Sequence, residues 1–302
     1  MVAEKFYLQL VTKIMILSIF ALSLDVLVGY TGLVSLGHAA YFGVAAYSLA
    51  LLAPSDNAAN VWVTLPLALA ASAAAALVIG ALVVRTAGVY FIMVTLAFAQ
   101  MVYYFFHDTR VAGGSDGIYV NERPQTFIPG LDLANDAHFY YAVLMLLVLV
   151  FALLAAMLRS PFGRALQGIK ANERRMRALG YATLRYKLAA FVIAGTLAGL
   201  AGYLTAAKEG YVNPEMLAWH QSGTVLMMLI LGGMGTLIGA VLGTFTYVLV
   251  QEWFSGITRH WQLLMGAFII AVVLVLPQGL AGLARARARR SPAPRPPGDA
   301  NE

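Results

Sequence analysis

The sequence is dominated by apolar runs that are nearly free of charge and follow one another along most of the chain. A helix rises about 1.5 Å per residue, so a run of about 20 apolar residues is long enough to cross the hydrocarbon core of a bilayer. The runs predict membrane helices at 7–28, 38–53, 61–84, 86–106, 138–158, 188–207, 222–236, 238–254 and 262–281. We therefore expect an all-α fold, a polytopic membrane helix bundle with about 8–10 transmembrane segments.

The composition indicates that lipid, rather than water, surrounds most of the chain. Of the 302 residues, 61% are hydrophobic and 11% are charged, whereas soluble domains carry about 25% charged residues. The stretches between the apolar runs are too short to build a core of their own. We expect one transmembrane domain over 1–284, followed by a basic, Pro-rich cytoplasmic tail over 285–302 that is disordered.

The residue patterns of catalysis, metal binding and ATP hydrolysis are missing from the sequence. Cysteine is absent, and the five histidines show neither HExxH nor any other paired ligand spacing. No GxxxxGK[ST] phosphate-binding loop occurs. We therefore expect that the chain is not an enzyme, has no catalytic or metal-binding residues and binds no cofactor itself.

Two glycine-rich stretches interrupt the apolar runs, GYTGLVSLG at 29–37 and GGMGTLIG at 232–239. Glycine allows helices to approach closely and allows non-helical backbone at membrane depth, where protein or a water-filled cavity covers it. These stretches predict broken or re-entrant elements within the bundle.

The distribution of charge predicts which loops face the cytoplasm. The net charge is +6, but thirteen of the 20 Lys and Arg residues lie in two blocks beside apolar runs, 159–187 and 285–295. This is the pattern of cytoplasmic membrane flanks, so we expect no nucleic-acid partner. The connection 107–137 holds five acidic residues and two arginines, and we expect it outside. Five full spans before residue 159 would place the N-terminus outside, whereas a re-entrant element at 29–53 would place it inside.

The cytoplasmic segment 159–187 also has an amphipathic pattern. On a helix, its basic residues gather on one face and its apolar residues on another, and Gly180 suits a C-terminal stop. The apolar residues are Leu166, Ile169, Met176 and Leu179. Three interpretations are open: a helix lying on membrane lipid, a basic loop with incidental periodicity, or a helix whose apolar stripe enters a groove on a soluble partner.

Five blocks of the sequence, in their order along the chain, resemble a known family. They are GYTGLVSLGHAAYFGVAAY at 29–47, GGSDGI at 113–118, ALQGIKANERRMRALGYATLRYKLAAFVIAGTLAGLAGYL at 165–204, GGMGTLIGAVLG at 232–243 and LPQGL at 276–280. Together they resemble the branched-chain amino-acid ABC transporter permease family, M-type subunit.

The resemblance implies a permease subunit of an ATP-binding-cassette importer, a multi-pass protein of the bacterial cytoplasmic (inner) membrane. Its implied partners are a homologous second permease subunit, two ATPase subunits that use ATP and Mg, and an extracytoplasmic substrate-binding protein. The implied solutes are branched-chain or other hydrophobic amino acids; similar permeases serve urea, short amides or aromatic carboxylates. The alternative is a stand-alone secondary transporter, but that class carries buried ionisable residues, and the spans here are nearly free of charge.

The resemblance also implies that 159–187 is the coupling loop, with the segment from Gln167 to Gly180 as the helix that docks on the ATPase. The residues implied for this role are Gln167, Ile169, Lys170, Asn172, Glu173, Arg174, Arg177 and Gly180. We expect Glu173→Pro to abolish ATP-coupled uptake while the protein still inserts into the membrane.

A candidate translocation path lies at the first glycine-rich stretch. Asp25 sits in an apolar span, where a carboxylate is costly, so it either lines a pathway or caps a helix near an interface. His38 is a lone histidine in this stretch, which favours a hydrogen-bonded structural residue over a proton relay. Half-helix ends and polar groups here suit the carboxylate and ammonium of a small zwitterion. The candidate residues are Asp25, Gly29, Thr31, Gly32, Ser35, Gly37 and His38.

The GGSDGI motif marks the external connection. Its composition predicts a turn, which is either an ordinary loop or a rim contact for a soluble binding protein. Its candidate residues are Gly113, Gly114, Asp116 and Gly117.

Overall fold

The computed structural model describes residues 2–54, 58–126, 132–276 and 279–282. The expected tail over 285–302, and part of the LPQGL motif, lie outside the described residues. The long helices are α1 (Val2–Asp25), α3 (Val61–Val83), α4 (Val89–Asp108), α5 (Asp136–Arg159), α8 (Thr183–Glu209) and α10 (Leu237–Ile257), and α11 (Trp261–Val275) belongs to the longer candidate span Trp261–Gly282.

The remaining elements are short. They are the π-helix η1 (Val26–Thr31) and the α-helices α2 (His38–Leu52), α6 (Pro161–Ala171), α7 (Glu173–Ala178) and α9 (Trp219–Gly232), the 3-10 helices η2 (Arg110–Ala112), η3 (Gly114–Asp116) and η4 (Pro214–Leu217), and the strands β1 (Ile118–Tyr119) and β2 (Tyr211–Val212).

The all-α membrane bundle expected from the sequence is confirmed. Each of the nine apolar runs contains a helix, and within the described residues seven helices are long and apolar enough to cross a membrane. Their ends follow local signals. Asn60 accepts the amide of Trp62 at 2.9 Å at the start of α3, and Asn135 accepts that of Ala137 at 2.9 Å at the start of α5.

The broken elements lie at α2 and α9, next to the two glycine-rich stretches. These helices have 15 and 14 residues, so each is about 21 Å long and too short to cross the bilayer alone. Their N-terminal ends meet inside the protein, where the buried Ser222 hydroxyl accepts the amide of Ala39 at 2.8 Å. The chain therefore contains two half-length helices whose first turns contact each other; α2 begins at the buried His38, and α9 begins at the exposed Trp219.

Helix α8 is the centre of the bundle and packs against α1, α2 and α3. It approaches them through small residues. A Cβ at Gly202 would collide with the backbone carbonyl of Phe42, and one at Gly199 would collide with the side chain of Ser72. Close backbone approach of this kind replaces the hydrophobic driving force that lipid cannot supply between membrane helices.

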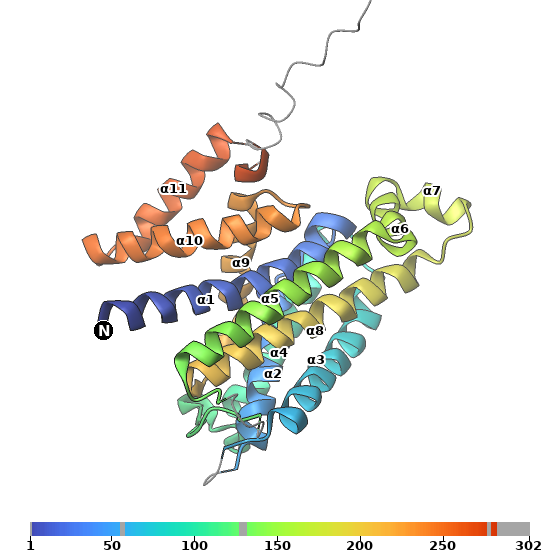
Figure 1. Ribbon diagram of the computed structural model, residues 1–302. Helices are drawn as coiled ribbons and strands as arrows, with labels where there is room; N and C mark the ends of the chain where they lie inside the picture. The colour runs from blue at the N-terminus through green and yellow to red at the C-terminus, as the bar shows by residue number, and fades with distance from the viewer. Residues whose placement is uncertain (1, 55–57, 127–131, 277–278, 283–302) are drawn as a thin grey trace, which may run out of the picture.

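The two ends of the bundle carry the oppositely charged connections. The basic α6–α7 hairpin lies at one end, and the described parts of the acidic connection, 107–126 and 132–137, lie at the other, where β1 pairs with β2 just beyond the end of α8 (Figure 1). The positive-inside rule places α6 and α7 in the cytoplasm. Helix α1 runs in the same direction as α5, so the first described residues lie at the external end (Figure 1). This geometry favours the outside location among the two alternatives for the N-terminus.

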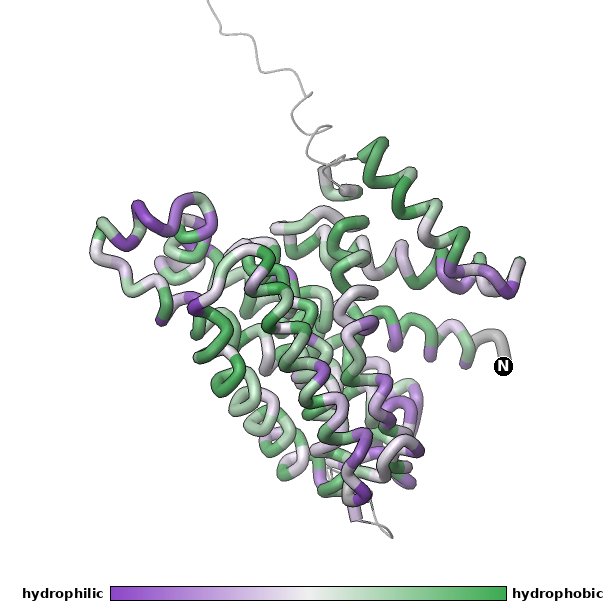
Figure 2. The backbone as a smooth tube through the Cα atoms, turned by 180° about the vertical axis from the view of Figure 1, so that it is seen from behind, coloured by the Kyte–Doolittle hydropathy of each residue, from purple (hydrophilic) through white to green (hydrophobic). Residues whose placement is uncertain are grey.

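The outer surface shows the same division. Hydrophilic residues gather on the α6–α7 hairpin and at the opposite end, whereas the residues of the helices between them are mainly hydrophobic (Figure 2). Large apolar side chains such as Val78 on α3, Met145 on α5 and Leu274 on α11 are 64%, 70% and 78% exposed. Such exposure is expected for side chains that face lipid.

Candidate functional site

The expected coupling helix is in fact two helices. Helix α6 begins at Pro161 and ends at Ala171, where Asn172 turns into an extended conformation with φ −160° and ψ 98°. The Asn172 side chain then accepts the amide of Arg175 at 3.0 Å and caps α7. The expectation of one helix from Gln167 to Gly180 was therefore wrong, because an Asn side chain at this position favours a new helix start over continuation.

The expected apolar stripe divides in the same way. Leu166 and Ile169 of α6 are buried in the protein, whereas Leu179, just after α7, is 66% exposed. Helix α7 has no buried residue among those that the structure describes, and Arg174 and Arg177 on it are exposed. Helix α6 is thus a base that packs on the bundle, and α7 is a knob that projects from it. Gly180, with φ +88°, ends the knob.

Glu173 holds the knob to the bundle. Its carboxylate pairs with Lys187 of α8, accepts the Thr183 hydroxyl at 3.2 Å and lies 3.1 Å from Arg177. Burial by itself raises the pKa of the Glu173 carboxyl, but the hydrogen bonds and charges of these three residues outweigh it and hold the pKa below its usual value. The carboxylate therefore joins α7 to the start of α8.

This position changes the expected effect of Glu173→Pro. Glu173 is the first residue of α7, where proline is well tolerated because the backbone N–H has no intrahelical partner. The substitution would act by removing the carboxylate rather than by breaking a helix. The effect on coupling remains a prediction, but its physical reason is different.

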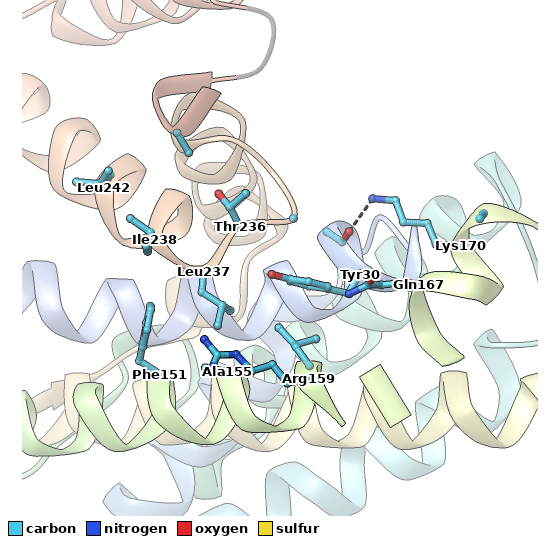
Figure 3. Close-up of a pocket in the computed structure, with 15 residues that line it drawn as sticks. Tyr30, Phe151, Ala155, Arg159, Gln167, Lys170, Thr236, Leu237, Ile238 and Leu242 are labelled. Atoms are coloured by element: carbon cyan, nitrogen blue, oxygen red, sulfur yellow. Dashed lines mark hydrogen bonds between the residues drawn. The ribbon is translucent and has the colours of Figure 1, made fainter. Parts of the chain in front are cut away.

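Lys170 connects the coupling residues with the candidate path. Its ammonium donates to the backbone carbonyl of Gly29 at 2.6 Å, as the dashed line in Figure 3 marks. Its side chain also lies against Gly32, which has φ +75° and ends the π-helix η1. The sequence assigned Lys170 to a different role from Gly29 and Gly32, and the fold brings the three together.

Asp25 and Gly29 contact the second glycine-rich stretch. The Asp25 carboxylate is buried and accepts the amide of Gly235 at 2.8 Å. A Cβ at Gly29 would lie 2.6 Å from the Cα of Gly235, so the two backbones touch. Within the described residues, the second carboxylate oxygen of Asp25 has no hydrogen-bond partner. The contact between 25–29 and 233–236 could not be found from sequence spacing, because 210 positions separate its partners.

Most of the other candidate path residues are bound within the protein. The His38 ring nitrogen Nε2 lies 2.8 Å from the Ser23 hydroxyl, and the ring is stacked on Phe20 at 5.7 Å. Thr31 donates to the Leu27 carbonyl at 2.6 Å, and the Ser35 hydroxyl accepts the amide of Gly37 at 3.2 Å. These four polar residues and Gly37 are buried, which matches the structural interpretation of His38.

The external GGSDGI motif forms the expected turn. Gly113, Gly114 and Gly117 have φ values of +76°, +58° and +73°, which residues with a Cβ rarely adopt. A Cβ at Gly117 would also meet the Val212 carbonyl. The Asp116 carbonyl accepts the Tyr211 hydroxyl at 2.6 Å. The motif therefore fixes the external connection to the segment that follows α8.

A cavity of about 940 Å³ lies beside the Lys170–Gly29 contact at the cytoplasmic end. Residues of η1, α5, α6 and α10 contribute its walls, as Figure 3 shows. Its polar lining includes Arg159, Gln167, Lys170 and Thr236, and its apolar lining includes Phe151 and Leu242. The expected coupling residues, η1 and the α9–α10 turn thus meet around one hollow.

Residues 6–273 match the family described as "Branched-chain amino acid transport system / permease component". The chain belongs to this family. The match spans the coupling segment, the candidate path and the external turn, and it confirms the family that the sequence blocks resemble.

Individual relatives support the same assignment. The high-affinity branched-chain amino acid transport system permease protein LivM of Salmonella typhimurium is 32% identical over 301 residues, which cover 92% of this chain and 70% of the relative. LivM of Escherichia coli (strain K12) has the same identity and coverage. The LivH permease protein of that E. coli strain is 28% identical over 125 residues, 41% of this chain and 40% of LivH. No solved structure matches this chain.

Family membership settles the class of protein. The expected multi-pass permease subunit of the cytoplasmic membrane is confirmed, and a permease component of this kind is not an enzyme. Similarity to both LivM and LivH indicates a second, homologous permease as its partner.

Proposed function

We propose that the chain imports branched-chain or other hydrophobic amino acids as one half of a permease pair. In this proposal, two separate ATPase subunits bind ATP and Mg and dock on the α6–α7 hairpin, and an extracytoplasmic binding protein delivers the solute. The LivM relatives support the solute class because their names carry it.

The observation that carries the proposal is the way the projecting knob is tied to the bundle. Glu173 joins α7 to Lys187 of α8, and Lys170 joins α6 to the carbonyl of Gly29 in η1, which directly follows α1. A movement imposed on the hairpin by closing ATPase subunits would therefore reach two membrane helices through direct contacts.

The movement would next reach the contact between Gly29 and Gly235. We place the cytoplasmic end of the translocation path here, because η1 and the α9–α10 turn press together through glycine backbones and the Asp25 carboxylate. Pulling Lys170 away would draw the Gly29 carbonyl with it and separate the two segments. ATP would thus open a contact that the permease by itself keeps closed.

The function is tested by uptake of labelled leucine into proteoliposomes that contain the chain, its second permease and the ATPase subunits. Uptake should require ATP inside and the binding protein outside. Uptake without ATP that collapses with an ionophore would instead establish secondary transport. If ATP-driven uptake is found for urea, a short amide or an aromatic carboxylate and not for leucine, the solute class is wrong and the permease role stands.

Lys170→Met tests the coupling path in the same proteoliposomes. The variant keeps the aliphatic stem of the side chain but loses the donor to the Gly29 carbonyl. We expect uptake per ATP hydrolysed to fall about tenfold, because a charged hydrogen bond of about 1.4 kcal/mol corresponds to that factor. Lys170→Arg retains a donor and should keep most of the uptake. Arg174→Met, on the exposed face of α7, should instead lower ATPase docking and ATP hydrolysis. Unchanged uptake per ATP in Lys170→Met would remove Lys170 from the path.

A further inference from the structure

A second hollow, of about 400 Å³, lies on the external half of the protein, away from the cytoplasmic cavity. Its lining comes from α1, α2, the last two turns of α8, η4 with Asn213 before it, α9, the second half of α10 and the first residue of α11. Helices α1 and α10 lie side by side in Figure 1 and pack against each other. Its volume is in the range of small-molecule binding sites. This hollow could not be found from the sequence, because its lining comes from seven separate elements.

The rim of the hollow carries charges of both signs. Lys13 of α1 and Lys208 of α8 line it, together with Glu209 and Glu215. Among the described residues, none of these four groups has an ion-pair partner within 4.0 Å. Ionisable side chains in membrane segments are costly and mark solute pathways when structural pairing does not account for them. Lys13 and Lys208 both belong to such segments.

The floor of the hollow is apolar. Ile16, Phe42, Val225 and Met228 line it and are 2%, 5%, 1% and 1% exposed. Methionine side chains adapt to ligands of different shape, and the aromatic ring offers a large contact area. An aliphatic group placed here would leave water for an apolar surface.

Between the rim and the floor, α9 supplies neutral polar groups. Helix α9 begins at Trp219, and Gln221 and Thr224 in its first two turns line the hollow. The amides at the start of a helix favour a carboxylate, so this end adds to the attraction of the two lysines. Glu209 and Glu215 offer acceptors for an ammonium group.

The hollow thus presents cations, anions and an apolar surface together, which matches the three parts of an aliphatic amino acid. We infer that it is the permease's own binding site for the incoming solute, with the carboxylate at Lys13 and Lys208, the ammonium at Glu209 and Glu215, and the side chain against Phe42. The inference rests on the proposed function, since it takes the solute to be an amino acid. Its position on the external half is where a solute released by a binding protein would arrive.

The absence of cysteine from the sequence permits a direct test in the complex of the chain with its second permease and ATPase subunits. Gln221→Cys places one thiol of this chain at the hollow, and Glu252→Cys places one on the exposed surface of α10 outside it. Leucine at ten times its Kd should slow maleimide labelling of Gln221→Cys about tenfold, because bound ligand excludes the reagent from about nine sites in ten. It should leave the Glu252→Cys rate unchanged. Any cysteines of the partner subunits are replaced, or the labelled subunits are separated by size on a gel, so that only labelling of this chain is counted.

Leucine analogues identify the contacts. Isoamylamine lacks the carboxylate and 4-methylpentanoate lacks the ammonium, so each should protect Gln221→Cys less than leucine does. Adding Lys208→Met or Lys13→Met should raise the leucine concentration needed for protection about tenfold, the loss of one charged hydrogen bond. Lys5→Met, which removes an exposed lysine of α1 outside the hollow, should leave it unchanged.

The outcomes separate this inference from the proposed function. If proteoliposomes take up leucine with ATP but leucine does not slow labelling of Gln221→Cys, the binding site is overturned and the function stands. If leucine protects but is not taken up, the site stands and the transport of leucine is overturned. Equal protection by leucine and both analogues would also overturn the site, since charge recognition at the hollow would be absent. An equal slowing of labelling at Glu252→Cys would overturn it too, because the protection would not be specific to the hollow.

Discussion

The charged groups at the two ends of this permease are arranged differently. At the cytoplasmic end, Glu173 pairs with Lys187, Lys170 binds the Gly29 carbonyl and Asp25 binds the Gly235 amide. On the external half, Lys13, Lys208, Glu209 and Glu215 line a hollow without ion pairs among the described residues. In our proposals, the bonded groups transmit force and hold the fold, whereas the unpaired groups meet a solute. Similar residue types would then serve mechanical and binding roles according to what surrounds them.

The largest effect on stability is expected for Glu173→Gln. The variant leaves Lys187, whose side chain is 6% exposed, without its carboxylate partner. We expect a loss of about 2 kcal/mol in the free energy of unfolding, because the Glu173 side of the pair is partly solvated. Denaturant titration of the purified chain in detergent measures it. Arg177→Gln is the matched control, because Arg177 is 63% exposed and such i,i+4 pairs contribute about 0.5 kcal/mol or less. Equal losses in both variants would mean that the inner pair does not hold α7.

The same pair predicts a pH dependence. The pKa of Glu173 is lowered in the folded protein, so its stabilisation is complete above the unfolded-state pKa of about 4.3 and is lost as the pH falls through the lower folded-state pKa. The difference in unfolding free energy between wild type and Glu173→Gln should therefore be constant near neutral pH and shrink below about pH 4. A difference that instead shrinks as the pH rises would show the opposite sign of the pKa shift.

A smaller effect is expected at Asp25. Asp25→Ala leaves the Gly235 amide without its acceptor and should cost about 1–2 kcal/mol, whereas Asp25→Asn retains an acceptor oxygen and should cost less. The two variants are compared by thermal unfolding in detergent, with leucine uptake measured in parallel. If Asp25→Ala and Asp25→Asn are equally stable, the contact with Gly235 does not hold the α9–α10 turn.

The smallest stability effects are expected on the external half. Glu215→Gln and Lys13→Met should change the free energy of unfolding by about 0.5 kcal/mol or less, because neither side chain has an ion pair to lose within the described residues. The measurement is the same denaturant titration used for Glu173→Gln. A loss comparable with that of Glu173→Gln would show that the external charges are structural, and the contrast between the two ends would disappear.

Much of the architecture was predictable because it depends on local composition. The apolar runs gave every long helix, and the glycine-rich stretches marked the places where α2 and α9 are shortened. The basic segment 159–187 and the acidic 107–137 connection gave opposite ends of the bundle. The division into α6 and α7 was missed, because periodicity reports which residues share a helix face and not whether Asn172 caps a new helix.

The sites depended on contacts that spacing along the chain does not contain. Glu173 was expected to face a partner, yet its carboxylate binds Lys187 and Thr183 of α8. Lys170 was expected to dock outward, yet it binds Gly29. Asp25 stood out in the sequence because a charge in an apolar span is costly, but its partner Gly235 became visible only in the fold.

The sequence by itself determined that this protein spans a membrane, which ends its loops occupy and to which permease family it is related, since hydropathy, charge bias and ordered motifs are local properties of the chain. The tertiary structure decided which charges are paired and which are left open to a hollow. That distinction depends on distances between helices far apart in sequence, and the packing of α8 and the glycine turns sets those distances.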